Sequence, residues 1–228
     1  MATTTPATTP ATVVDSPTST PVEHGLSHVT NTGISNEKLA MWTFLGSECL
    51  LFGALISTYF LYRGRSVTGP TPKQVYDIAY TSISSFVLLM SSLTMVLALA
   101  AIQRGDQARL RLWLMATALL GTVFIGGQVY EFTSFVHEGL TLKTNLFGSS
   151  FFVLTGFHGA HVTVGIMLLL SLAMMSYRGK IPQSKAEVIE IAGLYWHFVD
   201  IVWIVIFTVV YLIPSPHAPR PAVPVQIR

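Results

Sequence analysis

Five long apolar segments alternate with short polar connections after residue 35 of the chain. A helix that rises about 1.5 Å per residue needs roughly 20 apolar residues to cross roughly 30 Å of hydrocarbon, and each segment reaches that length. The segments cover residues 39–62, 80–102, 110–136, 147–177 and 188–213. The pattern therefore predicts an all-α fold, a polytopic membrane protein whose residues 36–213 form one bundle of five transmembrane helices.

The two ends of the chain lack such segments. Residues 1–35 are rich in Thr, Pro, Ala and Ser and carry almost no large apolar side chain, so they cannot bury a core and are expected to be disordered. They show no basic stretch followed by a short apolar one and no arginine, so neither a signal peptide nor a transit peptide fits. Residues 214–228 form a second, short tail.

Composition and charge support the membrane class and indicate an orientation. Hydrophobic residues make up 51% of the chain and charged residues 11%, and the formal net charge of +2 is too small to favour a nucleic-acid partner. The short connections on the side of the N-terminus are dense in Lys and Arg, which predicts a cytoplasmic 1–35 tail and an extracytoplasmic 214–228 tail. That side holds Lys38, Arg104, Arg109, Arg111, Arg178, Lys180 and Lys185, and the other holds Arg63, Arg65, Lys73, Lys143, Arg220 and Arg228.

Several polar side chains lie inside the apolar segments. A titratable group at the centre of a membrane helix costs roughly 2.5–3.5 kcal/mol or more, so each one implies a partner, a packed interior or a function. Spacing of three residues places His158 with His161, and His197 with Asp200, on shared helix faces. The candidate intramembrane network, structural or proton-related, comprises Glu48, His158, His161, His197, Asp200, Glu131 and Gln128, with Glu131 nearer the outer surface.

Three interpretations of these groups are open. The histidines could bind haem or a metal, but only one lies on the fifth segment and no cysteine or carboxylate cluster completes a shell. They could form a proton or ion pathway in an autonomous transporter, but inverted repeats and broken helices are not visible. We favour the third, in which they join helices that small residues bring close together. The glycines expected at these approaches are Gly46, Gly53, Gly156 and Gly159.

Further expectations concern single side chains of the apolar segments. Asp200, one turn from His197, could hold the imidazole in one tautomer. Trp196 and Trp203 lie seven residues apart and are expected to pack along one stripe. Tyr59, Tyr62 and Tyr211 lie near segment ends and are expected to anchor the helices at the membrane interface. Cys49 lies inside an apolar segment and is expected to be a buried thiol.

Two long motifs stand out in the fourth and fifth segments: Gly-Phe-His-Gly-Ala-His-Val at 156–162 and Tyr-Trp-His-Phe-Val-Asp-Ile-Val-Trp at 195–203. Shorter ones are Gly46-Ser47-Glu48, Gly105-Asp106, and Gln128 with Tyr130-Glu131. Together these motifs closely resemble subunit III of the haem-copper cytochrome c oxidases. The resemblance implies an accessory subunit that carries no haem or copper, stabilises the oxygen-reducing core, supports proton uptake and holds phospholipid in a cleft. Haem and copper then reside in the partner subunits I and II.

The chain is similar to the five-helix bacterial members of that family, which lack two N-terminal helices of the larger members. The resemblance implies a bacterial plasma membrane location and a proton-pumping respiratory complex. Its other subunits would receive electrons from cytochrome c or a cytochrome bc complex. Subunit III of a quinol oxidase, a homologue associated with nitric oxide reductase and, less favoured, an autonomous proton or ion transporter remain as alternatives.

Overall fold

The computed structural model describes residues 34–63, 78–137 and 146–213, and within these ranges it contains helices and no β-strand. The long helices are α1 (Asn36–Tyr62), α3 (Ile78–Gln103), α4 (Gln107–His137), α5 (Leu146–Tyr177) and α6 (Ala186–Phe207). A 3₁₀ turn, η1 (Gln183–Lys185), precedes α6, and a π-helical turn, η2 (Thr208–Leu212), follows it. All five spans are long and apolar enough to cross a membrane, which confirms the predicted all-α membrane fold.

The predicted segment boundaries agree with the observed helices to within three residues at most ends. The last segment differs because its final turn is π-helical rather than α-helical. Apart from Ile34 and Ser35, the predicted disordered tail 1–35 lies outside the described residues, and so does the predicted tail 214–228.

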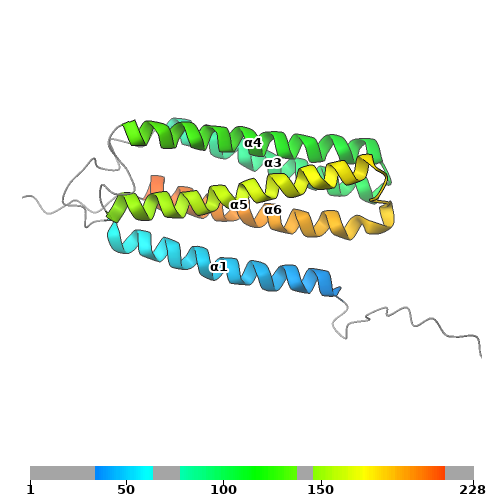
Figure 1. Ribbon diagram of the computed structural model, residues 1–228, viewed down its shortest axis with the longest axis horizontal. Helices are drawn as coiled ribbons and strands as arrows, with labels where there is room; N and C mark the ends of the chain where they lie inside the picture. The colour runs from blue at the N-terminus through cyan, green and yellow to red at the C-terminus, as the bar shows by residue number, and fades with distance from the viewer. Residues whose placement is uncertain (1–33, 64–77, 138–145, 214–228) are drawn as a thin grey trace, which may run out of the picture.

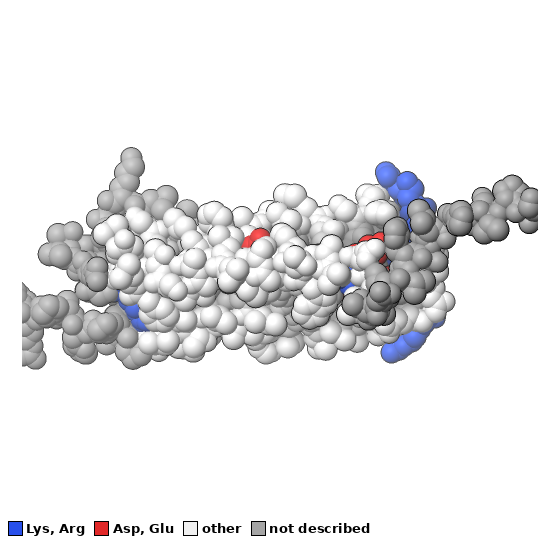
Figure 2. Space-filling view, turned by 90° about the horizontal axis from the view of Figure 1, so that it is seen from below, with Lys and Arg blue, Asp and Glu red and all other residues white. Residues whose placement is uncertain are grey.

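The helices run alternately up and down, so the start of α1 and the α3–α4 and α5–α6 connections lie at one end (Figure 1). Helices α3 to α6 form the main bundle, and α1 lies along its edge against α5 and α6. In the space-filling view, Lys and Arg lie at the two ends, and the side that faces the viewer carries few charged residues between them (Figure 2). Such a distribution is typical of a bundle whose sides face lipid or apolar partners.

Two glycines allow the sharp turns at the end shared by the α3–α4 and α5–α6 connections. Gly105 has φ +76° and Gly179 has φ +68°, a region that L side chains rarely adopt. Glutamine side chains tie the two turns together: Gln183 Nε2 donates to the Gln103 carbonyl at 2.6 Å, and Gln107 Nε2 to the Ile181 carbonyl at 3.2 Å. These turns therefore form two of the short polar connections between the apolar segments.

The centre of the main bundle is built around Trp196 of α6, which is 1% exposed. A Cβ atom on Gly121 of α4 would lie 2.6 Å from its indole ring, and one on Gly165 of α5 would lie 2.9 Å from it. The indole Nε1 donates to Ser91 Oγ of α3 at 3.0 Å. About two helical turns further along α6, Trp203 Nε1 donates to Ser85 Oγ at 2.8 Å. The predicted packing of Trp196 and Trp203 along one stripe is therefore confirmed.

The glycines at the closest helix contacts differ from most of those predicted. A Cβ added to Gly46, Gly53 or Gly156 would meet nothing within 4 Å among the described residues, so these three do not mediate close approach there. A Cβ on Gly159 would lie 3.0 Å from Gln128 Oε1, so this glycine does adjoin a neighbouring helix. The tightest approaches belong instead to Gly121 and Gly165, which the motif-based expectation did not single out.

Helix α1 is attached along a narrow seam. Its buried side chains are Leu45, Phe52 and Tyr59, spaced seven residues apart. Tyr59 is wholly buried, so the expectation that it is an interfacial anchor is wrong. Cys49 is exposed rather than buried, because it lies away from this seam.

A methyl group on Gly165 should destabilise the bundle. Gly165→Ala would push against the rigid, enclosed indole of Trp196, and overpacking of this kind costs about 1–3 kcal/mol. We expect the variant in detergent to lose its monodisperse form at a lower midpoint temperature than the wild-type protein does. Gly156→Ala, on the same helix with open space around it, is the matched control and should leave the midpoint nearly unchanged. Equal midpoints for the two variants would contradict the role of the clamped indole.

Candidate functional site within the membrane span

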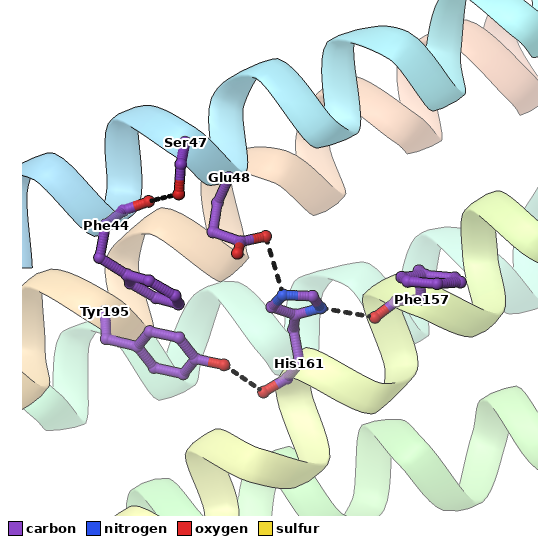
Figure 3. A network of polar contacts seen from close by, with 6 residues as sticks. All are labelled: Phe44, Ser47, Glu48, Phe157, His161 and Tyr195. Atoms are coloured by element: carbon purple, nitrogen blue, oxygen red, sulfur yellow. Dashed lines mark hydrogen bonds and ion pairs between the residues drawn. The ribbon is translucent and has the colours of Figure 1, made fainter.

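Glu48 of α1 and His161 of α5 form a hydrogen-bonded pair between the edge helix and the main bundle (Figure 3). Glu48 Oε2 lies 3.1 Å from His161 Nε2, and the two side chains are 14% and 17% exposed. His161 Nδ1 lies 2.8 Å from the Phe157 carbonyl oxygen one turn earlier. The Tyr195 hydroxyl donates to the carbonyl of His161 itself at 2.9 Å. The structure therefore unites two of the predicted site residues.

The contacts of His161 determine how many protons this pair holds. A carbonyl oxygen can only accept, so Nδ1 carries a hydrogen that it donates to Phe157. The Nε2 atom then either accepts from a protonated Glu48 or, as an imidazolium, donates to the Glu48 carboxylate. In both forms one proton lies between the two side chains and the pair is neutral overall. A neutral pair is far less costly in a membrane span than a lone charge.

Ser92 of α3 joins the other predicted pair. Its hydroxyl donates to Asp200 and lies 3.0 Å from His197 Nδ1, within hydrogen-bond distance. His197 and Asp200 share a helix face as predicted, but the expected direct contact between them is replaced by this bridge. Sequence reasoning missed Ser92 because it is one of many hydroxyl residues in α3 and its spacing does not distinguish it from the others.

His158 lies apart from both pairs. It is wholly buried, stacked on Trp203 with ring centroids 4.9 Å apart, and edge-on to Phe124 at 6.0 Å. Neither ring nitrogen has a hydrogen-bond partner among the described residues. His158 thus faces the α4 and α6 side of α5, whereas His161 faces α1. Within the described ranges no direct hydrogen bond links His158 to the Glu48–His161 pair or to the His197–Asp200 pair.

Glu131 of α4 is the centre of a third polar group. Its Oε1 atom accepts from Thr81 Oγ1 of α3 at 2.8 Å and from the Tyr211 hydroxyl of η2 at 3.1 Å. Tyr211 is 7% exposed, so it is an internal hydrogen-bond donor and not the interfacial anchor expected from its position. Gln128, one turn earlier on α4, is also buried, and its Nε2 has no partner in the described part of the chain.

The described residues contain no group of three or more His, Cys, Asp or Glu side chains that could hold a metal ion. The prediction that this chain carries no cofactor stays a prediction. What the geometry does show is that Glu48, His161, Asp200 and Glu131 each contact another helix.

Five membrane-spanning helices joined by buried polar contacts define a polytopic membrane protein. A model of the family described as Cytochrome c oxidase subunit III matches residues 23–215, which include all five spans. The chain belongs to this family, and it is a subunit III of a haem-copper oxidase complex that acts together with other oxidase subunits.

Similar proteins carry both of the names expected for the family. The chain is 41% identical to Quinol oxidase subunit 3 of Bacillus subtilis (strain 168), over 83% of this chain and 95% of that protein. It is 38% identical to Cytochrome c oxidase subunit 3 of Bacillus sp. (strain PS3), over 78% of this chain and 86% of that protein. Cytochrome c oxidase subunit 3 of Thermostichus vulcanus is 39% identical over 77% of this chain and 86% of its own length.

Removal of the Ser92 hydroxyl should loosen the contact between α3 and α6. Ser92→Ala leaves both His197 and Asp200 without this partner where no water replaces it, a loss of about 1–3 kcal/mol. We expect more of this subunit to dissociate when the complex is heated in detergent. Ser82→Ala is the control, because the exposed Ser82 hydroxyl bonds only the Ile78 carbonyl of its own helix. If both variants dissociate alike, the bridge does not hold these helices together.

Proposed function

We propose that this chain is the non-redox accessory subunit of a respiratory oxidase that reduces oxygen to water and pumps protons. Haem and copper reside in the partner subunits I and II, and cytochrome c delivers electrons to those subunits. The chain stabilises this core and supports proton uptake on the cytoplasmic side. We also propose that the subunit binds phospholipid.

The observation that carries this proposal is how the membrane-embedded histidines are used. Both ring nitrogens of His161 are engaged, by Glu48 and by the Phe157 carbonyl. His197 Nδ1 contacts Ser92, and the ring of His158 is stacked on Trp203. Contacts of this kind support a role in joining helices.

Purification through a tag on this chain tests the proposal. The tagged complex should contain haem and copper and consume oxygen, whereas the chain expressed alone should be colourless in detergent. A complex stripped of this subunit should start turnover normally and then lose activity faster, because its core is less stable. A stoichiometric haem absorption band on the isolated chain would overturn the non-redox assignment.

A quinol oxidase is the second candidate, and the similarity to Quinol oxidase subunit 3 of Bacillus subtilis favours it as much as the others favour cytochrome c. The electron donor binds elsewhere in the complex, so this chain does not decide between them. Oxygen consumption by the purified complex with reduced cytochrome c, compared with a quinol, separates the two. A copper-binding CxxxC motif in subunit II would favour cytochrome c.

Glu48→Gln should leave assembly and most oxygen reduction intact. The glutamine amide can donate to His161 Nε2, so the contact between α1 and α5 survives in neutral form. Glu48→Ala should instead cause subunit loss and faster inactivation during turnover, because His161 is left without this partner. Glu37→Ala, at an exposed position of α1, is the control. Immediate loss of turnover by Glu48→Gln in a fully assembled complex with normal haem would establish an obligatory proton carrier instead.

The proposed orientation in the bacterial plasma membrane has its own test. In a Cys49→Ser background, cysteine introduced by Arg178→Cys should react with an impermeant maleimide only after the membrane is permeabilised. Cysteine introduced by His217→Cys should react in intact cells. These results follow if the short basic connections stay in the cytoplasm. The reverse pattern would invert the topology.

A further inference from the structure

Helices α3 and α6 meet along a seam whose outer side carries two stripes of exposed apolar residues around one histidine. The stripes comprise Leu89, Leu93 and Val96 on α3, and Ile201 and Ile204 with the half-buried His197 on α6. These six residues form what we call the α3–α6 face. Spacings of four and three residues place each set on one side of its helix, the arrangement with which a helix packs along a partner helix.

Hydrogen bonds across the seam place the two stripes side by side. On the inner side, Trp196 of α6 donates to Ser91 of α3 at 3.0 Å. The next residue on each helix makes the outer contact, where Ser92 Oγ lies 3.0 Å from His197 Nδ1. At about 100° per residue, this step rotates outward on both helices, so the apolar stripes beside Ser92 and His197 face away from the bundle.

His197 differs from the other polar side chains on the outside of the spans. The exposed Ser and Thr hydroxyls of the five long helices donate to carbonyl oxygens of their own helix, as Ser57 does at 2.8 Å and Ser171 at 2.7 Å. These hydroxyls need no partner from outside the chain. His197 uses Nδ1 for Ser92, whereas its Nε2 has no hydrogen-bond partner in the described part of the chain.

The depth of His197 makes this Nε2 atom informative. The residue lies near the middle of the span Gln183–Leu212, about 21 Å from its start at the rise of a helix. Hydrocarbon offers no hydrogen-bond partner, so an Nε2 atom that faces lipid there would stay unsatisfied at a cost in free energy. Depending on the tautomer, Nε2 donates or accepts, and a hydroxyl or an amide can match it in either form.

We propose that the α3–α6 face docks against one transmembrane helix of another oxidase subunit. The apolar stripes pack along that helix, and a hydroxyl or amide side chain near its middle hydrogen-bonds to His197 Nε2. Close packing and internal hydrogen bonds drive helix association in membranes, and this face offers both. The proposal rests on the oxidase function proposed above, since that function supplies the partner.

Photocrosslinking in native membranes tests the docking face. Leu93→benzoylphenylalanine and Ile201→benzoylphenylalanine place a photoreactive group on either side of the seam, at side chains that are 54% and 60% exposed. After irradiation, the complex is purified through a tag on this chain and its adducts are mapped by mass spectrometry. We expect both probes to react with the middle of the same helix of another oxidase subunit. Leu119→benzoylphenylalanine, at a 64% exposed position of α4, is the control and should not react with that helix.

A bulky substitution should weaken docking. Ile201→Trp should lower the amount of the other subunits that copurify with this chain about tenfold, a change of about 1.4 kcal/mol in binding free energy. The matched control is Leu119→Trp, which should leave this amount unchanged. Because Ile201 is exposed on the chain itself, the Ile201→Trp chain should still be monodisperse in detergent.

A double-mutant cycle tests the hydrogen bond to His197. The hydroxyl or amide residue nearest the crosslinked position in the partner helix is replaced by alanine, alone and together with His197→Leu. If the two side chains contact each other, the double variant should retain about as much of the other subunits as the more severe single variant. Effects that simply add would show that His197 does not contact this group.

Other outcomes would overturn the proposed face. Probes at Leu93 and Ile201 that react only with lipid, or with a second copy of this chain, would reject it, and so would full retention of the other subunits by Ile201→Trp. In each of these cases the tagged wild-type complex still contains haem, so the oxidase assignment stands. A tagged wild-type chain that copurifies with no haem would instead reject the proposed function itself.

Discussion

The indole of Trp196 determines how closely the helices of the main bundle can approach. It extends from α6, lies against Gly121 of α4 and Gly165 of α5, and donates to Ser91 of α3. Lipid chains are as apolar as leucine, so burial of apolar surface adds little to helix association in a membrane. Close packing and internal hydrogen bonds must supply it instead. This one ring provides both, and it does so for all four helices at once.

Helix α1 lies outside that packing and is attached by a different means. Polar contacts join it to the bundle at three levels along its length. Lys38 Nζ lies 2.9 Å from Glu190 Oε2 near one end, Glu48 pairs with His161 in the middle, and Arg63 Nη1 donates to the Val209 carbonyl at 3.1 Å near the other. Between these levels the buried seam is only one side chain wide. The intramembrane pair therefore matters for attachment, because it is the polar contact at the middle level of this narrow seam.

The sequence predicts the spans well because the length of an apolar run directly determines whether a helix can cross the hydrocarbon. It predicts the partner of each side chain poorly, because that depends on how each helix is rotated. Gly156 and Gly165 show this clearly. They lie nine residues apart on α5, and at about 100° per residue they point to opposite faces. Only Gly165 meets Trp196, although Gly156 belongs to the more recognisable motif. The bridging role of Ser92 and the burial of Tyr59 and Tyr211 could not be predicted from the sequence for the same reason.

The polar groups of the span are divided among different helix pairs. Glu48 and His161 join α1 to α5, Ser92 joins α3 to α6, and Glu131 joins α4 to α3 and η2. Groups that share no partners contribute almost independently to stability, so loss of one leaves the others intact. A protein that conducts protons along a single path would need these groups connected. Their division instead favours a subunit whose buried polar groups hold its own helices in place, so that its apolar sides can meet lipid and the other oxidase subunits.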